Sequence, residues 1–267
     1  MHTKTVSLIF NCVLVALSLV YAPLSFAGRS CDAPAYDAYK VMQALELAQK
    51  THIRLADSHA DIAIIARVGQ DLSKYHLRYS HLGIVKHDAD GRWSVIHELN
   101  DCGTANSGLF DEGLGNFFLD DLFAFETLIL IPNPELQAKI RNLLENGKAK
   151  ALHDPHYNML SYPFSTKYQN SNQWALEVLA AAQAQGININ TREQAQAWLK
   201  SADYQADVLH IDTVTRLGAR MFRANVSFDD HPFDRRMSGS IDTVTVESIV
   251  RFILMRDNGA QKIVLGL

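Results

Sequence analysis

The sequence lacks a basic excess, internal repeats and low-complexity tracts. Its 25 Lys and Arg residues are scattered among 29 Asp and Glu residues, and the isoelectric point is about 6.2. This composition excludes the strongly basic character of most nucleic-acid-binding domains, so we expect no nucleic-acid partner. The content of 48% hydrophobic and 20% charged residues is instead typical of a globular protein.

Metal-binding motifs are also missing, although the chain has 11 His residues. No His-Glu-x-x-His and no Cys-x-x-Cys pattern occurs. His52 and His59 stand seven residues apart, and His153 and His156 stand three apart. We interpret these side chains as solvated or capping residues and expect neither a metal nor another cofactor.

Cysteine is scarce, and one of the three Cys residues lies in an N-terminal segment with the features of a leader. Residues 1–27 combine a positive start at Lys4, an apolar run over 6–21 and small residues up to Ala27, which predicts a secretory signal peptide. The alternative is a membrane anchor, but a spanning helix needs ~20 apolar residues. Cleavage would remove Cys12 and leave residues 28–267 in the periplasm or outside the cell, without a stable membrane span.

The two remaining cysteines, Cys31 and Cys102, are predicted to form a disulfide. Export places this even pair in an oxidising compartment, and closing so long a loop stabilises a fold by about 4 kcal/mol in the chain-entropy model. The alternative is that Cys102 is a reactive thiol. Gly103 and Thr104 follow it without the helix start that would lower the pKa of a thiol.

Hydrophobic periodicity predicts a mixed α+β fold, and the lack of a linker predicts one domain over 28–267. Expected helices cover 34–56, 133–146, 172–185, 191–201 and 246–256. Expected strands cover 61–68, 79–86, 93–99, 127–131, 208–211 and 221–228, with loops at 100–116 and 229–239. The Asp-Gly turn between the second and third strands predicts a hairpin, and therefore an antiparallel sheet.

The hairpin carries one His on each strand, His81 and His97. A lone His on a strand is most often a packed core residue. Paired positions across a hairpin, however, point to the same face with Cβ atoms about 5 Å apart, so one imidazole could orient the other as a base. Spacing leaves the register open, and a slip of one residue would put Glu98 in place of His97.

Asn170 and Ser171 stand where the helix over 172–185 begins. The free N–H groups and the positive end of the helix dipole favour a developing anion at this point. The same position makes either residue an ordinary N-cap, which is the simpler interpretation of the local sequence.

Read together, the stretches Ser-His-x-Gly-Ile-Val, Val-Ile-His and Asn170-Ser171-Asn172-Gln173-Trp174 resemble the NlpC-type papain-like peptidases of bacterial cell envelopes. Their order resembles the circularly permuted members, which include lecithin:retinol acyltransferase-like proteins and carry an Asn-Cys-x-x-aromatic motif. The resemblance implies a papain-like α+β fold, with an antiparallel sheet packed against helices. It implies His81 as the base, His97 as its orienting partner and Ser171 in the position of the nucleophilic Cys, with the Ser171 N–H in an oxyanion hole. We assign substrate contacts to Asn170, Tyr162 and Glu98.

The mature chain as a whole resembles a proteobacterial family catalogued as domain of unknown function 2145, which brings no established activity. The similarity is carried by 67–74, 97–104, 112–118 and 162–166.

Serine in place of cysteine leaves two functions open, because a hydroxyl is a far weaker acid than a thiol. The first is a serine-using hydrolase or acyltransferase that acts on amide or ester bonds of an envelope substrate. The second is a non-catalytic papain-like domain that binds a peptide, glycan or lipid fragment. A site elsewhere, including one at Cys102 or one that holds a metal, is the third possibility.

Overall fold

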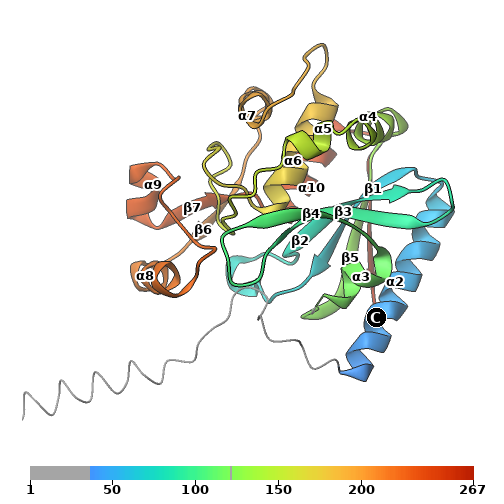
Figure 1. The fold of residues 1–267 in the computed structure, drawn as a ribbon, viewed down its shortest axis with the longest axis horizontal. Coiled ribbons are helices and arrows are strands. Elements are labelled where there is room, and N and C mark those ends of the chain that lie inside the picture. Colours follow the sequence, from blue (N-terminus) through green and yellow to red (C-terminus); the bar gives the residue numbers. More distant parts are fainter. Residues whose placement is uncertain (1–36, 121) are drawn as a thin grey trace, which may run out of the picture. The chain divides into compact units, whose positions relative to one another are not determined.

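The computed structural model describes residues 37–120 and 122–267 (Figure 1). The predicted signal peptide, residues 1–27, and Cys31 lie outside the described residues. Export and the pairing of Cys31 with Cys102 therefore stay predictions. Within the described ranges, no helix combines the length and the apolar character that a membrane crossing requires.

A six-stranded sheet runs through the described part of the chain, with the strand order β4-β3-β2-β1-β5-β8 (Figure 1). Each pair of neighbours in the sheet is antiparallel. The strands are β1 (Ile62–Val68), β2 (His81–His87), β3 (Trp93–Asn100), β4 (Ser107–Gly113), β5 (Ala124–Ile131) and β8 (Gln261–Gly266). The predicted class, an α+β fold with an antiparallel sheet packed against helices, is confirmed.

Helices cover both faces of this sheet (Figure 1). Successive side chains of a strand point to opposite faces, so Ile62 and Ile64 join one core cluster while Ala63 and Ile65 join the other. The first cluster includes side chains of α4 (Pro134–Glu145), α6 (Ser171–Gln183), α7 (Arg192–Ser201) and α10 (Val246–Arg256), and we call this side the α6 face. The second includes side chains of α2 (Ala38–Ser58) and α3 (Leu114–Leu119), and we call it the α3 face.

The start of α6 is fixed by a cap and by a buried tryptophan. The Asn170 side chain accepts from the backbone N–H of Gln173 at 2.8 Å, so Asn170 is the N-cap and Ser171 is the first helical residue. The indole N–H of Trp174 donates to the carbonyl of Ala149 in the short helix α5 (Lys148–Ala151). A cap of this kind stabilises a helix by about 1 kcal/mol.

A second, two-stranded sheet pairs β6 (Asp207–His210) with β7 (Ser240–Thr243). The chain between them forms α8 (Thr213–Phe222) and α9 (Phe233–Ser238). The strand expected at 221–228 is therefore wrong, because the Asp212 side chain caps α8 and its helix extends to residue 222.

Two of the expected loops contain regular structure. The range 229–239 includes α9, and the range 100–116 includes β4, which pairs with β3 from Ser94↔Gly113 to Asn100↔Ser107. A short 3₁₀ helix, η1 (Ser73–Tyr75), follows β1.

Candidate functional site

His81 and His97 are in direct contact on the α3 face. The Nε2 atom of His81 lies 2.8 Å from the Nδ1 atom of His97, and His97 Nε2 lies 3.0 Å from a carboxylate oxygen of Glu112 on β4. Both imidazoles are buried, with exposed fractions of 8% for His81 and 0% for His97. The predicted pairing of His97 with His81 is correct, and the third member, Glu112, was not foreseen.

The Glu112 carboxylate sets the direction of the hydrogen bonds in this chain. A carboxylate only accepts, so the proton of His97 lies on Nε2 and its Nδ1 atom is left as an acceptor. His81 Nε2–H then donates to His97 Nδ1, and the lone pair of His81 lies on its Nδ1 atom. Burial lowers the pKa of both imidazoles, and the nearby Arg67 guanidinium lowers both further. At His97 the Glu112 carboxylate opposes this decrease in pKa. Both rings are therefore neutral at pH 7, and His81 is held as an oriented neutral base.

Helix α3 closes over this pair. The Phe117 ring lies 5.4 Å from the ring of His97 and 5.9 Å from that of His81, measured between centroids. The Arg67 guanidinium lies 4.8 Å from the Phe117 ring, pairs with Asp120 and donates to the Phe117 carbonyl. These contacts hold the imidazoles in a dry, rigid environment.

Ser171 lies on the opposite face of the sheet. Register pairs His81 with Arg67 and leaves Leu82 and Ile84 in the core beneath α6. Because side chains alternate, the residue next to Leu82 points away from α6. The structure therefore brings His81 and His97 together but does not bring Ser171 to them. The predicted triad is corrected to an imidazole pair on one face and a helix-start serine on the other.

Ser171 is buried and has a different neighbour, Tyr157. Its hydroxyl is within hydrogen-bonding reach of the Tyr157 phenol, and burial raises the pKa of that phenol to about 12. Tyr157 therefore stays protonated at neutral pH and is not itself a base for the serine.

Glu98, predicted as a substrate contact, points to the α6 face with an exposed fraction of 0%. Burial raises the pKa of its carboxyl to about 8; the nearby Glu177 adds to this, while the Ser107 hydroxyl and Arg192 oppose it. Neither carboxyl oxygen has a well-formed hydrogen bond within the described residues. Glu98 is therefore largely protonated at pH 7.

A serine–histidine contact lies close to Glu98. The Ser107 hydroxyl on β4 is 3.1 Å from His153 Nε2, and burial lowers the pKa of His153. The sequence pattern favoured a solvated or capping role for His153. Ser107 lies next to Glu98 because β3 pairs with β4. The spacing of Glu98, Ser107 and His153 in the sequence could not predict that these three residues meet.

Behind Ser171, the buried carboxylate of Glu177 is fully engaged. It accepts from Arg192 Nε at 2.9 Å, from Gln169 at 2.7 Å and from Gln196 at 2.9 Å. Gln173 also donates to it at 3.3 Å. Burial raises the pKa of Glu177, and the Arg192 guanidinium opposes this rise. This network ties α6 to α7 and to the segment before α6.

The two other predicted substrate contacts have structural roles. The side-chain amide of Asn170 donates to the Thr243 hydroxyl at 3.1 Å, which joins α6 to β7. Tyr162 is half-buried, and its ring packs against Phe164 and His231 at centroid distances of 5.9 and 5.3 Å.

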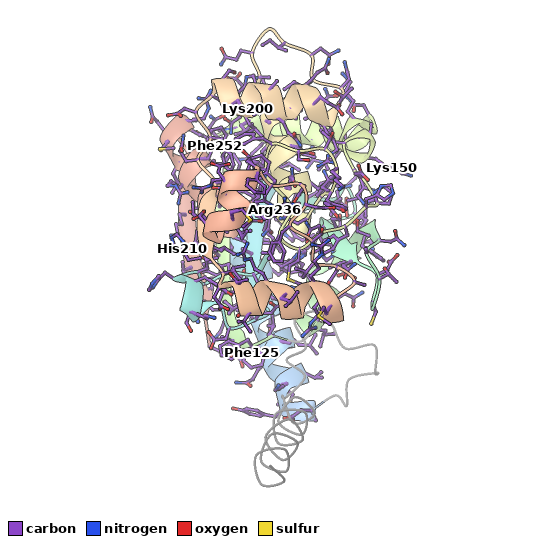
Figure 2. All side chains as sticks on the ribbon, turned by 90° about the vertical axis from the view of Figure 1, so that its left-hand side faces the viewer. Phe125, Lys150, Lys200, His210, Arg236 and Phe252 are labelled. Carbon is purple, nitrogen blue, oxygen red and sulfur yellow. The ribbon has the colours of Figure 1, made fainter. Side chains whose placement is uncertain are left out.

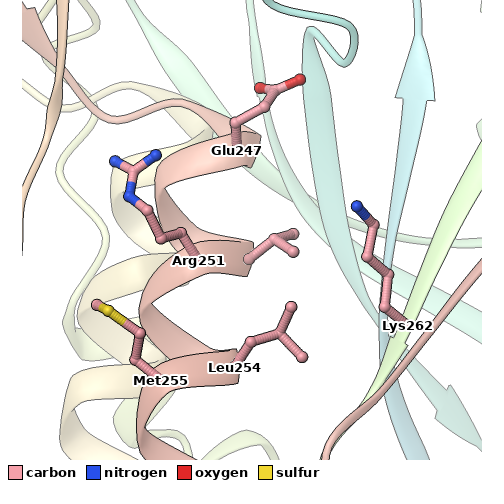
Figure 3. Close-up of a pocket in the computed structure, with 6 residues that line it drawn as sticks. Glu247, Arg251, Leu254, Met255 and Lys262 are labelled. Atoms are coloured by element: carbon pink, nitrogen blue, oxygen red, sulfur yellow. The ribbon is translucent and has the colours of Figure 1, made fainter.

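An open pocket of about 440 Å³ lies between α10 and Lys262 of β8 (Figure 3). It is lined by Glu247, Val250, Arg251, Leu254, Met255 and Lys262. Two of its charged groups are already engaged: Glu247 accepts from the backbone N–H groups of Arg78 and Tyr79, and Arg251 pairs with Asp207. No predicted site residue lines this pocket.

Among the described residues, no group of three or more His, Cys, Asp or Glu is arranged to hold a metal ion.

Comparison with known proteins identifies a family. A family model described as an uncharacterized protein conserved in bacteria, DUF2145, covers residues 54–253. No curated protein and no solved structure matches the chain.

Proposed function

From the premise that the chain belongs to DUF2145, a family of uncharacterized proteins conserved in bacteria, we propose that it is an exported envelope protein. In this proposal it binds a peptide, glycan or lipid fragment without cleaving it. Its fold derives from a circularly permuted papain-like domain. The order of the elements supports this derivation, because the His-bearing hairpin of β2 and β3 precedes α6 and α6 packs on those strands.

The observation that carries the non-catalytic proposal is the separation of Ser171 from His81 and His97 by the sheet. A serine hydroxyl needs a base within hydrogen-bond reach before it can attack a carbonyl. Its neighbour Tyr157 keeps its proton, as its pKa of about 12 requires. The serine position then serves to begin α6, and the buried imidazole pair serves to hold α3 on the sheet.

A second candidate function is a serine hydrolase or acyltransferase that uses a different base. Glu98 favours it, because this carboxyl shares the α6 face with Ser171 and its pKa of about 8 lies close to the range of general bases. In that reaction Glu98, acting through Tyr157, would take the Ser171 proton as the serine oxygen attacks an acyl carbonyl. The N–H groups at the start of α6 would stabilise the oxyanion, and the proton would pass to the departing amine or alcohol. Water or an acceptor would then release the acyl group.

Labelling with a fluorophosphonate probe between pH 7 and 9 separates the two functions. The binding function predicts no labelling of the mature protein and no difference between the wild type and Ser171→Ala. Ser107→Ala is the matched control, since Ser107 is a buried serine on the same face. Labelling that is lost in Ser171→Ala and kept in Ser107→Ala would refute the binding proposal and establish the hydrolase.

Ligand binding is measured separately, by thermal unfolding with peptidoglycan fragments, envelope-derived peptides and short-chain lipids. A ligand that binds the folded state alone raises the melting temperature with its concentration. Absence of any such rise across the three classes contradicts the binding function whatever the labelling result.

A further inference from the structure

Helix α8 exposes an apolar stripe. Val214, Leu217 and Met221 recur at intervals of three and four residues, and their exposed fractions are 81%, 60% and 67%. In a globular protein such a stripe normally faces the core. Here the core beneath α8 contacts the helix through Ala219 instead, and the stripe points away from the protein.

Helix α9 adds two more apolar side chains at the same end of the fold. Phe233 and Met237 stand one helical turn apart with exposed fractions of 69% and 63%. The Arg216 guanidinium of α8 donates to the Arg236 carbonyl of α9, which joins the two helices. Both helices lie beyond β6 and β7 at the left end in Figure 1, and that end faces the viewer in Figure 2. We call this surface the α8–α9 face.

The helices of the α8–α9 face carry a charge opposite to that of the whole chain, although two neighbouring carboxylates offset part of it: Asp242 pairs with Arg235, and Asp212 caps α8. The two helices carry four Arg residues and a single acidic residue, Asp234, whereas the chain has a formal net charge of -4. Arg220 is exposed beside the stripe, and the Arg236 guanidinium lies 5.7 Å from the Phe233 ring. Arginines flanking exposed apolar side chains are the arrangement of helices that lie in a membrane interface.

We propose that the α8–α9 face docks on an anionic phospholipid surface, with its apolar side chains at the acyl boundary and its arginines among the headgroups. A second copy of the chain fits this face poorly. A symmetric dimer would bring the same arginines of both copies together, and their repulsion would oppose contact. Anionic headgroups neutralise them instead. Access to such a surface in the envelope rests on the predicted export, and docking is independent of any chemistry at Ser171.

Co-sedimentation of the mature protein, purified after export, with vesicles tests this proposal. We expect binding to vesicles that contain phosphatidylglycerol, weaker binding to phosphatidylcholine alone, and release at high salt because salt screens the arginines. The double variant Leu217→Gln/Met221→Gln should lower the partition coefficient about tenfold. Arg220→Gln should weaken binding to the anionic vesicles and leave binding to phosphatidylcholine unchanged.

Matched controls lie on α2, where Met42 is 68% exposed and Ile53 is 51% exposed. Met42→Gln/Ile53→Gln and Arg54→Gln should bind vesicles as the wild type does. Ser171→Ala should also bind normally, so a failure of docking is distinct from a failure of the proposed function. Equal loss in the α2 and α8 variants, binding that ignores lipid charge, or a dimer in sedimentation equilibrium that Leu217→Gln dissociates would each overturn the proposal.

Discussion

Replacing Glu98 by Gln should remove the loss of stability that this carboxyl contributes between pH 5 and pH 8. The carboxyl has an ordinary pKa of 4.5, and burial raises it to about 8 in the folded protein. The folded state therefore holds a proton that the unfolded state has lost, and stability falls as the pH rises through this window. The stabilisation is fully present below pH 4.5 and is lost by pH 8.

The size of the effect follows from the same two values. Each pKa unit corresponds to 1.36 kcal/mol, so the difference between 4.5 and about 8 amounts to about 5 kcal/mol in total. Most of it, about 3–4 kcal/mol, is lost between pH 5 and pH 8. Gln has the shape of the protonated acid and does not titrate. Wild type should thus lose about 3–4 kcal/mol relative to Glu98→Gln over this range.

Urea unfolding followed by tryptophan fluorescence at four pH values measures this difference. The lowered pKa values of His81 and His97 act in the opposite direction, but they are common to both proteins and cancel. Glu145→Gln on the exposed side of α4 is the control and should stay within about 0.5 kcal/mol of wild type. Parallel curves for wild type and Glu98→Gln between pH 5 and pH 8 would refute the assignment of a raised pKa to Glu98.

Two further predictions concern packing and charge. Gly83→Ala should destabilise the protein by about 1–3 kcal/mol, because the new Cβ would lie 2.6 Å from Val95 Cγ1. The control in thermal unfolding is Gly113→Ala, where no atom lies within 4 Å of an added Cβ. Equal melting temperatures for the two variants would contradict the steric argument. Arg192→Ala should cost about 3–5 kcal/mol, since it leaves the buried Glu177 carboxylate without its ion pair. A loss below about 1 kcal/mol in urea unfolding would show that Glu177 is neutral in the fold.

Local signals in the sequence predicted elements whose formation depends on nearby residues. Asn133 and Pro134 indicated the start of α4, and the structure has the helix over Pro134–Glu145 with Asn133 as its cap. The apolar run of β1 was predicted as a buried strand, and all seven of its residues are buried. The cap of α4 lies within or next to the element itself, and the apolar side chains of β1 carry their own signal although its hydrogen bonds come from β2 and β5.

Elements whose stability comes from distant partners were missed. Strand β4 reads as Ser-Gly-Leu-Phe-Asp-Glu-Gly and has no apolar alternation; it forms because β3 supplies its hydrogen bonds. Strand β8 was missed although Ile263-Val264-Leu265 follows the turn residues Asn258 and Gly259, and it pairs with β5.

The candidate site shows the same division. The hairpin predicted the contact between His81 and His97, because one lies on each of its two strands. Which face of the sheet they occupy could not, because it depends on where α6 packs. Glu112 belongs to β4, which was not predicted. The hydrogen bond that fixes the tautomer of His97 could therefore not be predicted either.

Strand β3 places two ionisable neighbours, His97 and Glu98, on opposite faces of the sheet, and each has an exposed fraction of 0%. One peptide unit is the shortest mechanical link between the helical layers on the two sides. A ligand that shifted β3 from the side of α6 would also displace the His97 ring, whose centroid lies 5.4 Å from that of Phe117. The imidazole resonances of His97 are thus a built-in reporter, on one side of the sheet, of events on the other.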